Sequence, residues 1–110
     1  YAFGACFSSG VMMPMGYEYG FRKSLDVVKT RPEDWEEPLF DLSGFIGEVN
    51  RMKAGSAVLN EEGPQERLTA TDEPVLALLR RASRDGEAVF VVANTDRRRE
   101  HALKTERLHG

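Results

Sequence analysis

The sequence contains one cysteine, Cys6, which excludes an internal disulfide framework and any metal site built from several cysteines. It also lacks an apolar run of the ~20 residues that a membrane-spanning helix needs, because Gly4, Gly10 and Pro14 interrupt residues 2–15. Neither sign of charge dominates: 15 basic and 18 acidic residues give a net charge of −3, so we expect neither nucleic acid nor membrane as a partner. What the 110 residues do have is an ordinary 41% hydrophobic content, enough for one folded domain or part of one.

The first residues show no initiator methionine, basic leader or apolar segment followed by a cleavage site. The sequence begins at Tyr1, as if within a protein. We therefore expect a fragment of a longer polypeptide, located in the cytoplasm.

The N-terminal third combines two apolar segments with a long irregular one. Residues 1–9 are typical of the tail of a buried helix, and the short apolar run 11–15 predicts a strand buried on both faces, with Pro14 at its end or edge. Residues 16–40 follow no period and are rich in aromatic and charged side chains. Loops longer than ~12–15 residues are often functional, so we expect function there.

The clearest helix is predicted over residues 41–54, with Asp41 as its N-cap and Gly55 beyond its end. Gly44 and Gly47 lower helix propensity and suggest the close approach of a neighbouring element. Five apolar side chains recur at three- and four-residue intervals and share one face: Leu42, Phe45, Ile46, Val49 and Met52.

The C-terminal half follows a turn-rich boundary at residues 60–64, and residues 67–70 form a candidate short strand. Residues 74–81 fit a helical stripe, but residues 75–80 also fit a hairpin with residues 87–93 across Asp85-Gly86. The residues themselves leave both alternatives open.

Self-contained catalytic motifs are absent from the sequence. His101 and His109 lie in polar surroundings without a ligand cluster, so we expect surface residues, no metal site and no cofactor. Cys6, among aromatic neighbours, is interpreted as a buried small hydrophobe. The arginines at 97–99, with those at 80, 81 and 84, are interspersed with acids and predict a solvated face.

Glu18 follows the predicted strand, where parallel α/β folds bind ligands. It is either a hydrogen-bonding group at a site or an ion-pair partner of Arg22 or Arg31. Trp35, with two tyrosines near Glu18, either stacks on a sugar ring or anchors the loop.

Several motifs then follow in a recognisable order. Gly16-Tyr17-Glu18 precedes the long loop, the helix ends in Asn50-Arg51-Met52-Lys53, and Ala57-Val58-Leu59 lies beyond it. Two apolar runs, at residues 75–80 and 89–96, complete the series. This order resembles the end of the α-amylase family (glycoside hydrolase family 13). Arg31-Pro32-Glu33-Asp34-Trp35 is more similar to its maltosyltransferase branch, which transfers maltose from maltose 1-phosphate to α-glucan.

The resemblance implies an α+β chain in two parts. Residues 1–59 would hold the last strand, a long loop and the last helix of a (β/α)8 barrel, and residues 60–110 part of an antiparallel β-sandwich-type C-terminal domain. It also favours the hairpin over the helix at residues 75–80.

The same resemblance implies an α-glucan-active parent, a glycosidase or transglycosidase. The family's catalytic carboxylates lie on earlier barrel strands, so we expect no catalytic residue in this chain and no activity from it alone. Such a retaining mechanism needs two carboxyl groups about 5–5.5 Å apart. Five residues are candidates for contact with an α-glucan or maltooligosaccharide: Tyr17, Glu18, Arg31, Asp34 and Trp35.

Two other classes of function fit the residues. One is a stand-alone carbohydrate-binding module in which Tyr17, Tyr19 and Trp35 form a glycan platform. The other is an oligomerisation domain. We expect self-association in either form, because apolar residues 1–15 and unpaired strand edges would be left uncovered.

Overall fold

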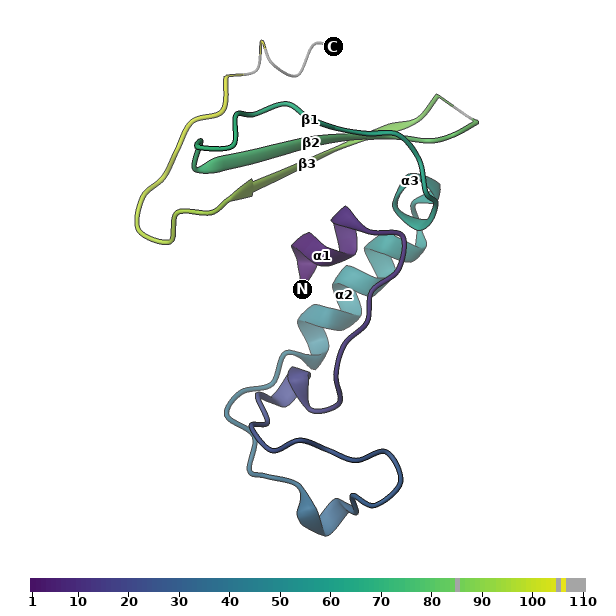
Figure 1. Ribbon diagram of the computed structural model, residues 1–110, viewed down its shortest axis with the longest axis vertical. Helices are drawn as coiled ribbons and strands as arrows, with labels where there is room; N and C mark the ends of the chain where they lie inside the picture. The colour runs from purple at the N-terminus through teal and green to yellow at the C-terminus, as the bar shows by residue number, and fades with distance from the viewer. Residues whose placement is uncertain (85, 105, 107–110) are drawn as a thin grey trace.

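The computed structural model describes residues 1–84, 86–104 and 106, and shows an α+β arrangement (Figure 1). All helical elements precede all strands along the chain. The helical elements are α1 (Ala2–Phe7), η1 (Tyr17–Tyr19), η2 (Pro32–Asp34), α2 (Ser43–Ala54) and α3 (Ala57–Asn60), and the strands are β1 (Gln65–Arg67), β2 (Val75–Arg81) and β3 (Ala88–Asn94). The molecule is elongated, 54 × 37 × 22 Å, with the sheet at one end, α1 and α2 in the middle and the 16–40 loop at the other end.

The three strands form an antiparallel sheet in the order β1-β2-β3. Leu78 of β2 faces Val91 of β3, which confirms the expected hairpin. Gly86 has φ +69°, the left-handed backbone that a tight turn needs, whereas Asp85 lies outside the described residues. The predicted short strand at residues 67–70 is displaced, since β1 shares only Arg67 with it.

Helix α2 confirms the prediction from periodicity and corrects its N-cap. The first intrahelical bond runs from Ile46 N to the Leu42 carbonyl (2.9 Å), so Leu42 occupies the cap position. Asp41 Oδ1 accepts from Ser43 N at 2.8 Å and still satisfies one of the free N–H groups of the first turn. The helix ends at Gly55, as expected.

The expected close approach at Gly44 and Gly47 is wrong for the described residues. A Cβ added at either glycine would meet nothing within 4 Å. This face of α2 is open, so no packing requirement selects glycine there.

The predicted strand at residues 11–15 is also wrong. These residues are irregular, and no strand of the described sheet lies beside them. A buried parallel strand needs neighbours for its N–H and C=O groups. Here Met12 is 97% exposed, and the Pro14 carbonyl accepts from Tyr17 N to open the turn into η1.

Helix α1 forms where an apolar helical segment was expected, but only its Ala5 is buried. Phe3 and Phe7 stack at a centroid separation of 5.6 Å and remain partly exposed. Cys6 is half-buried, so its interpretation as a buried hydrophobe is only partly right.

The core joins α2 and α3 to the inner face of the sheet. Its buried side chains include Ile46, Val49, Val58, Leu78 and Val91. Burial of this apolar surface, worth about 25 cal/mol per Å², fixes the helices against the hairpin.

Two buried cations, Lys53 and Arg80, complete this junction. Lys53 Nζ donates to the carbonyls of Ala5 (2.9 Å), Ser8 (2.7 Å) and Leu59, which uses all three of its N–H donors. Burial, together with the nearby Arg80 charge, holds the pKa of Lys53 below its usual value.

Arg80 is 3% exposed, so the expectation of a solvated face is wrong for this residue. Its Nη1 donates to the Cys6 carbonyl (2.7 Å) and its Nη2 to the Glu61 carbonyl (2.9 Å). The two cations thus tie α1, α3 and β2 together through backbone oxygens.

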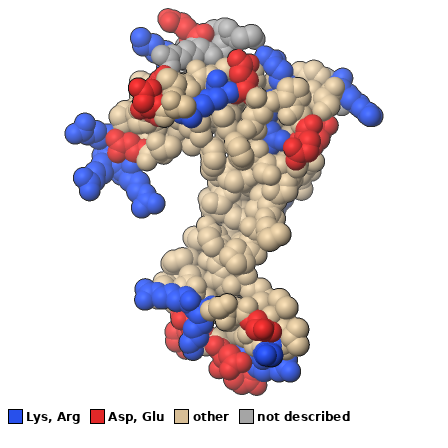
Figure 2. Space-filling view, viewed as in Figure 1, with Lys and Arg blue, Asp and Glu red and all other residues tan. Residues whose placement is uncertain are grey.

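Charged side chains gather at the two ends of the molecule and leave the middle largely uncharged (Figure 2). None of the helices built from the described residues has the length and apolar character to traverse a bilayer. The uncharged middle is where α1 and α2 present exposed Phe3, Phe7, Phe45 and Met52.

Candidate functional site

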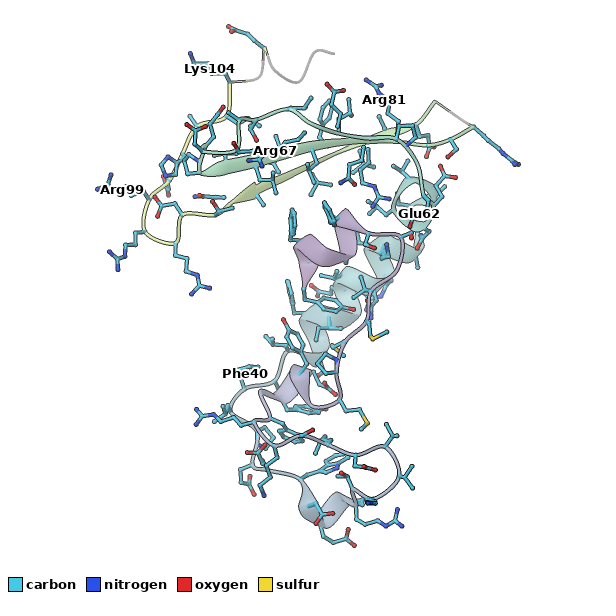
Figure 3. All side chains as sticks on the ribbon, in the orientation of Figure 1. Phe40, Glu62, Arg67, Arg81, Arg99 and Lys104 are labelled. Atoms are coloured by element: carbon cyan, nitrogen blue, oxygen red, sulfur yellow. The ribbon has the colours of Figure 1, made fainter. Side chains whose placement is uncertain are left out.

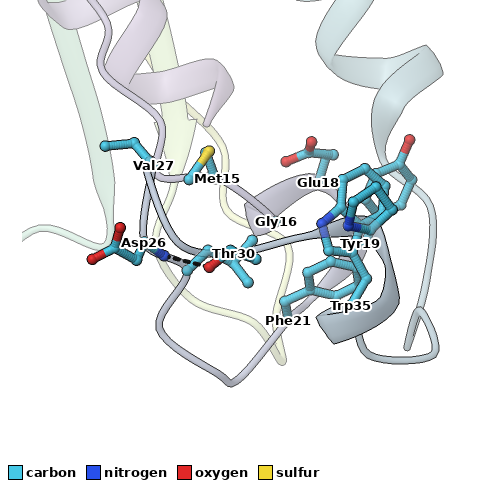
Figure 4. Close-up of a pocket in the computed structure, with 11 residues that line it drawn as sticks. Met15, Gly16, Glu18, Tyr19, Phe21, Asp26, Val27, Thr30 and Trp35 are labelled. Carbon is cyan, nitrogen blue, oxygen red and sulfur yellow. Dashed lines mark hydrogen bonds between the residues drawn. The ribbon is translucent and has the colours of Figure 1, made fainter.

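A cavity of about 280 Å³ lies within the 16–40 loop (Figure 4). It has an apolar wall and a few polar groups, as small-molecule sites commonly do. Its lining consists of Met15, Gly16, Glu18, Tyr19, Phe21, Leu25, Asp26, Val27, Thr30, Pro32 and Trp35.

The cavity is shaped first by the glycines on either side of η1. Gly16 and Gly20 have φ +82° and +68°, so the chain reverses tightly at both ends of this short helix. A Cβ on Gly16 would lie 2.5 Å from the Phe21 ring, and Phe21 N donates to the Gly16 carbonyl at 3.0 Å. The turn therefore presses Phe21 into the cavity wall.

Carboxylates that accept backbone N–H groups hold the rest of the loop. Glu36 Oε2 accepts from the backbone of Arg22 (2.7 Å) and Lys23 (2.8 Å), and the bond from Lys23 is the main reason that the pKa of Glu36 lies below its usual value. Asp26 Oδ1 accepts from Val28 and Lys29, and the bond from Lys29 likewise lowers the pKa of Asp26. The loop is thus ordered by local turns.

Glu18 supplies the most unusual polar atom of the cavity. Its Oε2 is buried and has no hydrogen-bond partner, while its main-chain carbonyl accepts from Leu42 N at 2.8 Å. The described residues form no ion pair between Glu18 and Arg22 or Arg31, so that alternative is not supported. A desolvated carboxylate oxygen without a partner is costly, and a ligand hydroxyl or amide donor would satisfy it.

Aromatic rings form the wall near Glu18. Phe21 lies between two of them, with ring centroids 5.8 Å from Tyr19 and 6.2 Å from Trp35. Trp35 is 56% exposed, and Figure 4 shows Tyr19, Phe21 and Trp35 grouped on one side of the cavity. Exposed aromatic faces beside a hydrogen-bonding group suit the apolar face of a sugar ring and its hydroxyls.

The structure brings together two of the five residues predicted from sequence, Glu18 and Trp35. Tyr17 instead lies 6.3 Å from the Tyr1 ring and lines a neighbouring hollow with Met13 and Pro14.

Arg31 and Asp34 are absent from the cavity lining and act on the loop's own backbone. Asp34 Oδ2 accepts from Arg31 N at 2.9 Å and caps η2, and Arg31 Nη1 donates to the Val28 carbonyl at 3.3 Å. They order the turn that places Trp35.

Sequence reasoning missed Asp26 and Thr30 as lining residues. Thr30 Oγ1 accepts from Asp26 N at 2.7 Å, a short-range pairing drawn in Figure 4. The signal was an aspartate followed by threonine four residues later, which is typical of a side-chain-stabilised turn.

No group of three or more potential ligands that could hold a metal ion occurs among residues 1–84, 86–104 and 106. His101 Nε2 lies 2.8 Å from Asp96 Oδ2, an exposed pairing that lowers the pKa of Asp96. His109 lies outside the described residues.

Comparisons with known proteins give one informative similarity. No family model matches the chain, and no solved structure matches it. The sequence is 33% identical over 100 residues to the alpha-1,4-glucan:maltose-1-phosphate maltosyltransferase of Burkholderia pseudomallei (strain K96243). The match covers 84% of this chain but 9% of that enzyme, so the chain is similar to less than a tenth of a maltosyltransferase.

Proposed function

We propose that this chain is part of an α-glucan-active enzyme of the α-amylase family, of the maltosyltransferase type. Residues 1–59 would close the catalytic barrel and residues 60–110 would begin a β-sandwich-type C-terminal domain. The similarity to the maltosyltransferase supports this proposal, as does the succession of a long loop, an amphipathic helix and an antiparallel hairpin.

In this proposal the chain does not perform the chemistry by itself. A retaining glycosyl transfer needs a nucleophilic carboxylate and an acid about 5–5.5 Å apart. The second carboxylate of the cavity, Asp26, accepts two backbone N–H groups, which favour its ionised form and make it a poor proton donor. The chain's contribution would be binding.

The binding role rests on one observation, the unpartnered buried Oε2 of Glu18 beside the aromatic wall. The carboxylate would accept from a glucosyl hydroxyl, and Trp35 or Tyr19 would cover the ring's apolar face. A platform of Tyr17, Tyr19 and Trp35, as in a stand-alone binding module, is less well supported because Tyr17 packs near Tyr1.

The test is a titration of the chain with maltoheptaose, followed by fluorescence of Trp35, its one tryptophan. We expect a saturable change that Glu18→Gln weakens by roughly tenfold, the effect of losing a hydrogen bond to a charged acceptor. Glu33→Gln, an exposed acid in the same loop, is the matched control and should leave binding unchanged. The absence of any response, or equal losses in both variants, would contradict the proposal.

We also place the parent enzyme in the cytoplasm, since a sugar phosphate donor is an anion that does not cross a bilayer unaided. Self-association of the chain remains part of the proposal. It is supported by the exposed apolar side chains of the uncharged middle, among them Phe3, Phe7 and Met52.

A further inference from the structure

The outer edge of β3 is unprotected. β3 pairs with β2 on one side, and no other strand of the described residues lies on its other side. Its seven residues, 88–94, include no charge and no proline, the features that usually keep an edge strand from pairing with another chain. Residues 95–104 rise past β1 in Figure 1 and so lead away from this edge.

We propose that this edge pairs antiparallel with β3 of a second copy of the chain, with the two-fold axis at Val91. This interaction is independent of the sugar-binding role proposed above. The two three-stranded sheets then form one continuous sheet, and both unpaired edges are satisfied by the same contact.

The side-chain pattern of β3 is complementary to itself in this register. Phe90 and Val92 lie on the outer face, 43% and 51% exposed, while Val91 points toward the helices and is buried. Antiparallel pairing about Val91 sets each Phe90 opposite Val92 of the other copy. Aromatic and β-branched side chains opposite each other are a favourable cross-strand pair, and the symmetry supplies that pair twice.

The charges at the two ends of β3 favour the same orientation. Glu87 precedes the strand, whereas Arg97, Arg98 and Arg99 follow it and are exposed. Figure 3 labels Arg99 at this end of the hairpin, and Figure 2 shows basic side chains projecting there. Antiparallel pairing brings the acidic end of one strand to the arginines of the other, whereas parallel pairing would set arginines against arginines.

The test measures the molar mass of the chain across a concentration series, by light scattering after size exclusion. We expect a concentration-dependent dimer. Val92→Lys should raise its dissociation constant at least about tenfold, because a lysine then faces Phe90 of the other copy at both symmetric positions. Met12→Lys, on a 97% exposed side chain far from the sheet, is the control and should leave the dimer intact.

A charge swap tests the register itself. The double variant Phe90→Glu/Val92→Lys sets Glu opposite Lys twice and should recover most of the lost affinity. A monomer at all concentrations, an unaffected Val92→Lys variant, a failed rescue, or equal loss in Met12→Lys would each overturn the proposal. The last outcome would assign association to the N-terminal apolar face.

A measurement on the unmodified chain covers the case in which Val92→Lys loses its hairpin circular dichroism. Amide hydrogen exchange of residues 88–94 should slow as the concentration rises through the dimer range. Exchange that is independent of concentration would overturn the proposal.

Discussion

The two ends of this molecule are held together in different ways. At the junction of α1, α2, α3 and the sheet, apolar side chains are buried and two cations bind carbonyls far apart in sequence. In the 16–40 loop only Gly16 is buried, and the order comes from carboxylates that accept nearby N–H groups. A binding cavity can therefore be shaped almost without a core, and such a region opens at lower free energy than the core it is attached to.

The largest effect should follow removal of the buried amine. Lys53→Met leaves three backbone carbonyls without their donor, and we expect a loss of about 3 kcal/mol in the free energy of unfolding. Denaturant unfolding followed by circular dichroism measures it. Lys104→Met, at an exposed position, is the control and should change little. Equal midpoints for both variants would mean that the junction does not depend on this cation.

A loop variant should come second and act locally. Gly20→Ala forces a side chain onto a backbone with φ +68° and to within 2.7 Å of the Phe40 ring, at a cost of about 2 kcal/mol. Because the loop has little core, we expect Trp35 fluorescence and maltoheptaose binding to change while the hairpin's unfolding midpoint holds. Gly10→Ala meets nothing within 4 Å and should leave both readouts unchanged. A shifted hairpin midpoint would show that the two regions unfold together.

A smaller effect of opposite sign is expected in α2. Gly47→Ala adds a methyl group where nothing lies within 4 Å, and the improved helix propensity should stabilise the chain by about 0.5–1 kcal/mol. Thermal unfolding measures the change. A lower midpoint would show that another element, such as a second copy, contacts this face of α2.

The smallest effect should be the acid response of the loop. Hydrogen bonds from the backbone lower the pKa of Glu36 and of Asp26 in the folded loop, so the stability they add is full above the ordinary values of 4.5 and 3.8. It is lost as the pH falls through the lowered folded values. Amide exchange at Arg22 and Lys23 should therefore quicken on acidification before that of β2, and Glu36→Gln should remove this dependence. Simultaneous quickening of both regions would contradict a locally held loop.

The sequence predicted those parts whose signal is local. The apolar spacing of α2 predicted the helix, because one face of it packs on the core. The hairpin fits two patterns, and the family resemblance favoured the correct one. The strand at residues 11–15 failed because an apolar run becomes a strand only beside a partner strand, and the described residues offer none.

The site was predicted in part for a similar reason. Glu18 and Trp35 were recognised as an acid and an aromatic in an irregular loop, and both line the cavity. Asp34 has the same composition signal but bonds the backbone of its own turn, a choice set by local geometry. Lys53 and Arg80 could not be foreseen, because carbonyl partners leave no pattern in the side chains.

That choice of acceptor has a consequence for how the sequence can vary. A carbonyl oxygen is present whatever side chain a residue bears, so replacements at Ala5, Ser8 or Glu61 keep the acceptors as long as the chain path is kept. The whole chemical burden of the junction thus falls on two positions, 53 and 80. Drift at the surrounding positions is tolerated, whereas a shorter or uncharged side chain at either of these two disconnects the helices from the sheet.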